Sequence, residues 1–141
     1  MFNNRNDSNL SLTVVVYKNQ ARKIIDAVSG YDFVDKIIAY QPDPERLPKY
    51  DSSLNPKLEY SSDWSESSGG DVFFISSPSN THVPYIEKIL SSENNGSNPY
   101  VYCEKPPGVT IPQIDWLESR TCDLSKRTSL TPCDRCGIDF C

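Results

Sequence analysis

Two uninterrupted apolar runs constrain the fold of this 141-residue chain more than any other feature. Residues 12–16 (LTVVV) are β-branched at every position after the first, and residues 72–75 (VFFI) contain no polar residue. A strand with one face in water alternates polar and apolar residues, whereas a strand covered on both faces does not. Both runs therefore predict central strands of a parallel sheet that lies between two layers of helices.

Helical and further β-type patterns alternate with these two runs along the chain. Residues 20–28 form a predicted helix, because Ala21, Ile24, Ile25 and Val28 share one face at helical spacing. Two more helices are predicted from Asn80 or Thr81, as the cap, to about residue 90, and over residues 110–119 with Thr110 as the cap. Further strands are expected at residues 33–40, 57–60 and 99–103. Residues 61–70 are expected to form a loop, with Trp64 covering the sheet.

This order of elements predicts an α/β, Rossmann-like three-layer fold with about five mostly parallel strands. The length fits one domain. We divide the chain into a flexible arm over residues 1–10, a Rossmann-like domain over residues 11–119, and an irregular tail over residues 120–141.

Charge and hydropathy argue against several classes of function. The chain has 19 acidic against 14 basic residues and no basic stripe, which argues against a nucleic-acid surface. No apolar run reaches the length of a membrane span, and the N-terminus lacks the apolar segment of a secretory signal. We therefore expect a cytoplasmic protein that binds neither nucleic acid nor a membrane.

A charged pair ends the last predicted strand. Tyr100 to Cys103 runs directly into Glu104 and Lys105, and Pro106 and Pro107 then stop the ladder because proline has no N–H to donate. This places Lys105 at the carboxyl edge of the sheet, where open α/β sheets bind their ligands.

Two motifs in this order resemble the Gfo/Idh/MocA family of NAD(P)-dependent oxidoreductases. The first is Glu104-Lys105-Pro106 after a hydrophobic strand; the second is Asp71-Val72 opening a strand, followed by Ser77-Pro78-x-x-x-His82 before a helix. The resemblance covers residues 10–119. It implies a domain that binds NAD or NADP, in an enzyme that oxidises a hydroxyl carbon of a sugar, cyclitol or sugar nucleotide.

The resemblance also implies roles for individual residues. Lys105 would be the catalytic candidate, lying beside the nicotinamide and orienting cofactor or substrate. His82, the only histidine, is expected as a packing or cleft-wall residue and not as a base, because a helix N-terminus disfavours a protonated ring. A cis bond is expected before Pro106. The other predicted cofactor-binding residues of the two motifs are Ser76, Ser77, Pro78, Glu104 and Pro106.

The sequence departs from the family at two cofactor markers. The turn after the first strand, Tyr17 to Ala21, has no glycine, although Asn19 tolerates a left-handed conformation and Ala21 replaces the third glycine. Tyr17 and Asn19 are thus the predicted phosphate-side residues. Gln41 stands where an acidic residue normally holds the ribose, and Asp43 lies close enough to substitute for it.

The tail is a different kind of sequence, with four of the five cysteines. Cys133-x-x-Cys136 has the spacing of a metal knuckle, and Cys122 and Cys141 would complete a set of four thiolates. A zinc site, a redox pair and an accidental tail without a function are the three alternatives that the sequence leaves open. Because no β-rich substrate domain follows, we hypothesise that the chain is a truncated product of a reading-frame shift and is inactive alone. We expect no metal in the Rossmann-like domain itself. The alternative function is a non-catalytic Rossmann-like binding or interaction domain.

Overall fold

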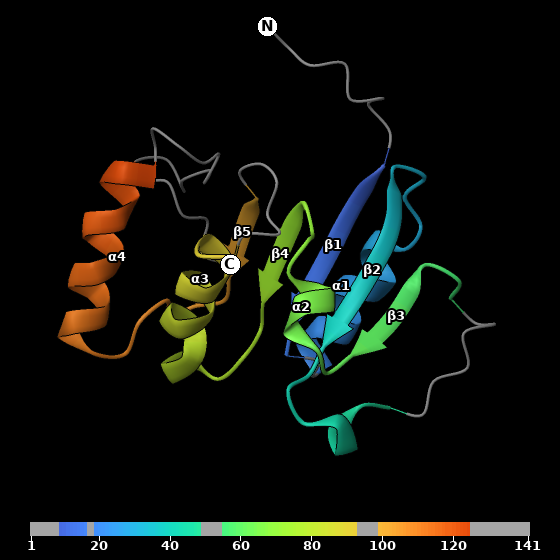
Figure 1. The fold of residues 1–141 in the computed structure, drawn as a ribbon, viewed down its shortest axis with the longest axis horizontal. Coiled ribbons are helices and arrows are strands. Elements are labelled where there is room, and N and C mark those ends of the chain that lie inside the picture. The colour runs from blue at the N-terminus through green and yellow to red at the C-terminus, as the bar shows by residue number, and fades with distance from the viewer. Residues whose placement is uncertain (1–8, 17–18, 49–54, 93–98, 125–141) are drawn as a thin grey trace, which may run out of the picture.

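A computed structural model describes residues 9–16, 19–48, 55–92 and 99–124. In these residues five parallel strands form one sheet in the order β3-β2-β1-β4-β5 (Figure 1). The strands are β1 (Leu10–Val15), β2 (Val34–Tyr40), β3 (Leu58–Ser61), β4 (Val72–Ile75) and β5 (Tyr100–Cys103). The predicted Rossmann-like α/β class is confirmed.

Helices cover both faces of the sheet. The α-helices are α1 (Asn19–Val28), α2 (Trp64–Ser67), α3 (His82–Leu90) and α4 (Ile111–Leu124), with short 3-10 turns η1 (Pro44–Arg46) and η2 (Ser79–Thr81). Helix α1 lies behind the sheet in Figure 1, and α2 and α3 lie in front of it. The described residues thus form the three layers that the uninterrupted apolar runs predict.

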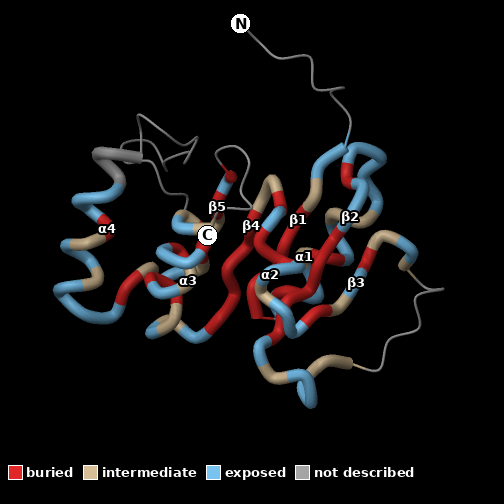
Figure 2. Tube along the Cα trace, in the orientation of Figure 1, coloured by how far each residue is buried: buried red, intermediate tan, exposed pale blue. Residues whose placement is uncertain are grey.

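Each face of the sheet has its own core, and β4 contributes to both. Phe73 and Ile75 pack with Ile86 of α3, whereas Phe74 packs with Ile25 of α1. Figure 2 shows the buried strands between the more exposed helices. Because successive side chains of a strand point to opposite faces, a strand in this position needs apolar residues at consecutive positions.

The predicted loop over residues 61–70 contains a short helix, and this part of the prediction is wrong. Asp63 caps α2, since its Oδ1 accepts from Ser65 N at 2.8 Å. The helix presents Trp64 to the sheet, with its ring 5.1 Å from the ring of Tyr40 and 6.0 Å from that of Tyr85. The predicted role of Trp64 as a cover for the sheet is therefore confirmed.

The motif aspartate Asp71 joins β4 to β1 at the amino edge of the sheet. Its Oδ2 accepts from Ser11 N at 2.9 Å and from Ser11 Oγ at 3.0 Å. One carboxylate thus aligns the starts of two strands that lie 60 residues apart in sequence.

The predicted caps of the last two helices have different outcomes. Thr110 Oγ1 accepts from Gln113 N at 3.3 Å at the start of α4, as predicted. Neither proposed cap of α3 holds its first turn: Thr81 makes no capping bond, and its Oγ1 donates to Pro78 O at 2.6 Å. On α4, Leu117 is buried, whereas Ile114 is 43% exposed.

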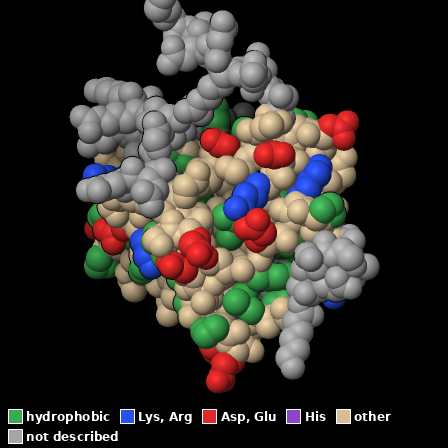
Figure 3. Space-filling model, turned by 45° about the vertical axis from the view of Figure 1, so that its right-hand side comes forward, with side chains coloured by type: hydrophobic (Ala, Val, Ile, Leu, Met, Phe, Trp, Pro, Cys, Tyr) green, Lys and Arg blue, Asp and Glu red, His purple; other side chains and the backbone are tan. Residues whose placement is uncertain are grey.

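The surface mixes charges of both signs, as the face drawn in Figure 3 illustrates. On the outer strands Lys36 Nζ and Glu59 Oε2 form an ion pair at 2.9 Å. Within the described ranges, no helix has the length and apolar character to cross a membrane.

Candidate functional site

The carboxyl edge of the sheet has its switch point between β1 and β4, where the strand order reverses direction. Ser76 closes this point, because its N–H donates to Val15 O at 3.1 Å and its hydroxyl donates to Val16 O at 2.9 Å. In open α/β sheets, ligands bind in the crevice outside this point. Ser76 therefore lies where the sequence predicts it.

Val16 holds the turn that leaves β1 in a left-handed conformation, with φ of 67°. A β-branched residue in this region is strained, and glycine is the residue that adopts it freely. Asn19, which the sequence offers as a residue that tolerates this conformation, does not adopt it: Asn19 is the first residue of α1, and Val16 is the described non-glycine residue with positive φ. Val16 is only 6% exposed, so its side chain is part of the core.

Ala21 allows α1 to pack closely on the sheet at the expected third-glycine position. It is fully buried, whereas Asn19 at the start of the helix is exposed. A free helix N-terminus offers backbone N–H groups to an anion. Tyr17, the other predicted residue of this turn, lies outside the described residues.

The loop that carries Lys105 continues the sheet by one hydrogen bond and then turns away. Glu104 N donates to Ile75 O at 3.1 Å, and the Lys105-Pro106 peptide bond is cis, as predicted. Lys105 is exposed, so its ammonium is open to a ligand. The buried thiol beneath the loop, Cys103, has its pKa raised to about 12 by burial and by the Glu104 carboxylate.

His82 joins the two motif loops. Its Nδ1 lies 2.7 Å from Pro106 O and its Nε2 lies 2.8 Å from Ser77 O. The ring is 1% exposed, so it does not face the solvent as a base would. The two segments that carry the family resemblance are therefore side by side, and His82 is the packing residue that the sequence predicts.

Ser77 is buried with its hydroxyl unused. Its side chain is 5% exposed, and its Oγ has no hydrogen-bond partner in the part of the chain that the structure describes. A buried hydroxyl without a partner costs free energy, which a ligand that bonds to it would recover. Sequence reasoning placed Ser77 at the cleft, but nothing in the sequence indicated that this hydroxyl is free.

Gln41 and Asp43 occupy the end of β2 differently from what the sequence suggests. Gln41 is 3% exposed, and its Oε1 accepts from Asp43 N at 3.4 Å. Asp43 caps η1 by accepting from Glu45 N at 3.1 Å, and its Oδ2 pairs with Arg46 Nε at 3.1 Å. The proposed substitute carboxylate is thus already engaged within its own turn.

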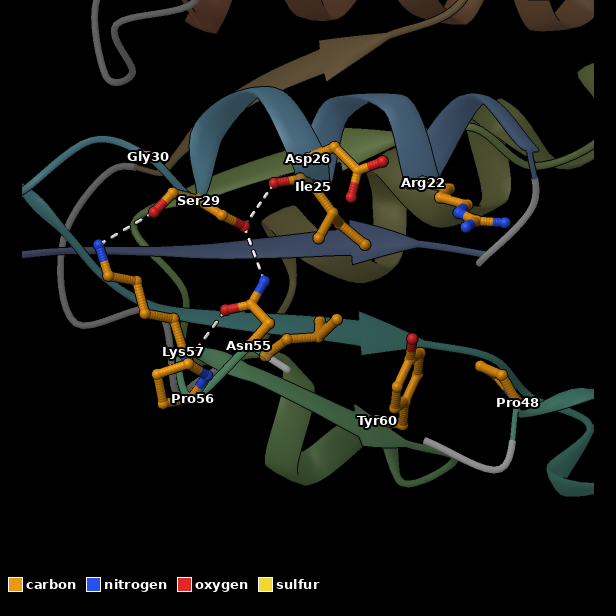
Figure 4. Close-up of a pocket in the computed structure, with 11 residues that line it drawn as sticks. Arg22, Ile25, Asp26, Ser29, Gly30, Pro48, Asn55, Pro56, Lys57 and Tyr60 are labelled. Atoms are coloured by element: carbon orange, nitrogen blue, oxygen red, sulfur yellow. Dashed lines mark hydrogen bonds between the residues drawn. The ribbon is translucent and has the colours of Figure 1, made fainter. Parts of the chain in front are cut away.

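A groove in the described part of the molecule lies away from these residues. This groove of about 810 Å³ runs between α1 and β3, with Arg22 and Tyr60 near one end and Asn55 and Lys57 near the other (Figure 4). No predicted site residue is among the described residues that line it. Its polar groups are engaged locally, as when Lys57 Nζ donates to Tyr31 O at 2.9 Å.

Metal ligands do not gather in the described part of the chain, where no three His, Cys, Asp or Glu side chains lie together. Of the four cysteines of the proposed zinc set, three lie outside the described residues, at positions 133, 136 and 141. The fourth, Cys122, lies within α4, and its side chain is not described. The zinc alternative therefore stays a prediction.

Comparison with solved structures identifies dehydrogenases with this fold. The scyllo-inositol dehydrogenase from Lactobacillus casei matches 95% of this chain with a TM-score of 0.68 and 19% identity. The WlbA dehydrogenase from Bordetella pertussis, solved with NADH and UDP-GlcNAcA, matches 88% with a TM-score of 0.67 and 16% identity. The UDP-N-acetylglucosamine 3-dehydrogenase GnnA from Acidithiobacillus ferrooxidans matches 87% with a TM-score of 0.65 and 13% identity.

In each of these three comparisons the matched part is 36% of the other chain, so this protein spans about a third of their length. No protein-family model matches the sequence. No curated protein matches it either. The structural match to dehydrogenases that the two motifs predicted is confirmed at the level of the fold.

Proposed function

We propose that this chain is the dinucleotide-binding domain of a Gfo/Idh/MocA-type oxidoreductase. The observation that carries the proposal is the meeting of the two motif loops at the carboxyl edge, next to the switch point of the sheet. Loops at this place are the ligand-binding part of doubly wound α/β folds. The proposal includes the division of the chain into a domain at residues 11–119 with an arm before it and a tail after it, and a cytoplasmic location.

Each site residue has a proposed task that fits its chemistry. The exposed ammonium of Lys105 would hydrogen-bond the nicotinamide ribose or the substrate hydroxyl and stabilise negative charge on the substrate oxygen. Ser77 Oγ would bond the cofactor, and Ser76, Pro78, Glu104 and Pro106 would form the cleft wall. On the phosphate side Asn19 would offer its backbone N–H, and Gln41 would lie near the adenosine ribose. Tyr17, outside the described residues, stays a proposed phosphate-side residue from its place in the sequence.

The described residues fit a dinucleotide in part. The buried Ala21 and the Ser77 hydroxyl, which has no partner among the described residues, support binding. NAD or NADP, when bound, would supply the nicotinamide carbon that accepts a hydride. The substrate class we propose is a sugar, cyclitol or sugar-nucleotide hydroxyl; the Bordetella pertussis structure contains UDP-GlcNAcA as well as NADH.

A second candidate function is a Rossmann-like domain that binds no dinucleotide. The observation that favours it is the turn after β1, where strained Val16 replaces the glycine that lets a pyrophosphate approach the backbone. Titration of the purified chain with NADH and NADPH, followed by nucleotide fluorescence, separates the two candidates. A dissociation constant in the micromolar range supports the first, and no signal at millimolar nucleotide supports the second.

Two serine variants sharpen this experiment. Ser77→Ala removes a hydroxyl without a described partner, so we expect unchanged or slightly higher stability and about three- to tenfold weaker nucleotide binding. The matched control Ser76→Ala removes a bond to Val16 O, so it should lower stability by about 1 kcal/mol. Unchanged affinity in Ser77→Ala would place the nucleotide elsewhere or exclude it.

A further inference from the structure

The side-chain amide of Gln113, in the first turn of α4, joins the two motif loops. Its Oε1 accepts from Val109 N at 2.9 Å, in the loop that carries Lys105. Its Nε2 donates to Asn80 O at 3.4 Å, in the 3-10 turn η2 of the other loop. The second contact connects residues that lie 33 positions apart in the sequence.

The two partners fix which way the Gln113 amide points. A backbone N–H can only donate and a backbone carbonyl oxygen can only accept, so the side-chain oxygen must face Val109 and the side-chain nitrogen must face Asn80. Glutamine has one group of each kind at its tip. Glutamate at the same length has acceptors alone, and the thioether of methionine is only a weak acceptor. The position therefore requires the amide and not only the length of the side chain.

The Lys105 loop lies close against this turn of α4. Gly108 is buried, and a Cβ added there would lie 3.2 Å from Gln113 Cβ and 3.5 Å from Ile114 Cγ1. Thr110 Oγ1 accepts from Gln113 N at 3.3 Å at the same place. The end of the loop is therefore packed on α4 through one residue, Gln113.

Lys105 has no side-chain bond that sets its direction. Its side chain is exposed and makes no hydrogen bond or ion pair with the residues that the structure describes. The place of its ammonium therefore depends on the backbone of the loop. That backbone is attached at two points, at Pro106 O by the buried ring of His82 at 2.7 Å and at Val109 N by Gln113 at 2.9 Å.

We propose that Gln113 is a positioning residue, whose amide holds the Lys105 loop against η2 and so sets where the Lys105 ammonium lies relative to the Ser77 loop. The consequence for the ligand rests on the proposed function, which assigns Lys105 to the nicotinamide ribose or the substrate hydroxyl. When the bond to Asn80 O is lost, the loop stays attached to α4 but is no longer tied to η2, and nucleotide affinity falls.

The variant Gln113→Glu separates the two contacts. Glutamate keeps an oxygen that accepts from Val109 N, but it places a second oxygen against Asn80 O, where glutamine has a donor. An acidic side chain in the first turn of a helix is favourable, and glutamate three residues after a threonine cap is a common pairing. The helix should therefore keep its stability while the contact between the loops is lost.

The first measurement needs no ligand and uses amide NMR and hydrogen exchange of the full chain. In Gln113→Glu we expect the Val109 amide to stay protected from exchange and the Thr81 and Lys105 amides to shift. In Gln113→Met, which lacks the amide, Val109 should lose its protection as well. Ser119→Ala, which removes a local bond further along α4, is the matched control. Thr81 and Lys105 shifts no larger in Gln113→Glu than in this control would overturn the proposal.

The second measurement is a titration with NADH beside urea denaturation. We expect Gln113→Glu and Gln113→Met to bind NADH about three- to tenfold more weakly than wild type. Gln113→Glu should do so with unchanged or higher stability, which a merely structural role of the side chain does not predict. Because only one of the two variants adds a charge, a loss in both excludes repulsion of the nucleotide as its cause.

A double-variant cycle shows whether Gln113 acts through Lys105. In a Lys105→Ala background the loss caused by Gln113→Met should disappear, because the ammonium that it positions is gone. A loss of the same size in both backgrounds contradicts the proposal. If wild type binds no NADH at any concentration, the proposed function fails, while the ligand-free amide shifts still decide whether Gln113 holds the loop.

Discussion

At the scale of single residues, Val16 combines an unfavourable backbone conformation with a buried side chain. The left-handed φ of 67° is unfavourable for valine, and residues held in this way cost about 1–3 kcal/mol. The strain persists because the side chain is buried in the core on the α3 face. A favourable hydrophobic term therefore offsets an unfavourable backbone term at one position.

This balance predicts an unequal pair of glycine variants. Val16→Gly loses buried side-chain area but relieves the backbone, whereas Val15→Gly only loses area, because Val15 is fully buried in a regular strand. We expect Val16→Gly to cost at least about 2 kcal/mol less free energy of unfolding than Val15→Gly, measured by urea denaturation. Equal losses would show that the turn carries no strain.

Cys103 predicts a loss of stability at alkaline pH. Its pKa is raised to about 12 in the folded chain, above the ordinary thiol value of 9.0, so the unfolded chain releases this proton first. The contribution of the Cys103 thiol to the free energy of unfolding is complete below pH 9.0. It is lost as pH rises through about 12, at up to about 1.4 kcal/mol per pH unit. Burial raises the pKa of Tyr40 and Tyr85 in the same direction.

Urea denaturation of wild type and Cys103→Ala at several values from about pH 8 to about pH 10.5 measures this term. We expect a shallower fall in the variant, with a residual slope from the two tyrosines. The variant is less stable at every pH because it loses a buried side chain, so the test is the difference in slope and not the absolute stability. Parallel curves for the two proteins would contradict the prediction.

At the scale of elements, the strands and helices follow from local pattern, whereas the joints between them do not. The apolar run Val72–Ile75 is typical of a buried strand, and the spacing of Ala21 and Ile25 is typical of a helix with one buried face. Strand β4 and helix α1 could therefore be predicted from sequence. The turn after β1 could not, because Asn19 is locally the better left-handed residue, and only the tertiary packing of Val16 moves that conformation three positions earlier.

The site shows the same division. Lys105, Ser77 and His82 could be predicted to lie at one edge of the sheet, because parallel strands end there together. The contacts that complete the site depend on which carbonyls meet the ring of His82 and on the isolation of the Ser77 hydroxyl. These are distances of a few ångströms between distant segments, and no periodicity in the sequence reports them.

The joint before β4 gives a prediction about glycine. A Cβ added at Gly70 would lie 2.8 Å from Thr13 Oγ1, whose hydroxyl donates to Ser67 O at 2.8 Å in a buried position. Gly70→Ala must therefore move Thr13 and break this bond, and we expect a loss of about 1–3 kcal/mol. The matched variant Gly30→Ala meets nothing within 4 Å and has no positive φ, so it should be neutral or stabilising by up to about 1 kcal/mol.

Thermal unfolding of the two glycine variants beside wild type makes the comparison. A second change, Thr13→Val in the Gly70→Ala background, removes the hydroxyl that meets the new methyl group but not the bulk of the side chain. If Gly70→Ala proves as stable as Gly30→Ala, Gly70 does not approach Thr13 as closely as the structure shows.

At the scale of the whole molecule, two cores share one sheet. The α1 face is built on Leu12, Val14 and Phe74, and the α3 face on Val15, Phe73 and Ile75, so neighbouring residues of β1 and β4 belong to different cores. Neither face can lose its packing while the shared strands stay in place. The described domain should therefore unfold as one unit, despite the division of its core into two layers.

Alanine variants on the two faces test this coupling. Ile25 of α1 is 2% exposed and Ile86 of α3 is 3% exposed, so each truncation to alanine should cost about 2–5 kcal/mol.

Trp64 and Trp116 both pack on the α3 core, so tryptophan fluorescence reports that face, while circular dichroism reports all helices. Because the strands join the cores, Ile25→Ala should lower the fluorescence midpoint as much as the dichroism midpoint, although it lies on the opposite face from both tryptophans. Ile86→Ala is the matched variant on the reporting face. Separate midpoints for the two probes in Ile25→Ala would mean that the faces unfold independently and that β1 and β4 do not transmit the loss.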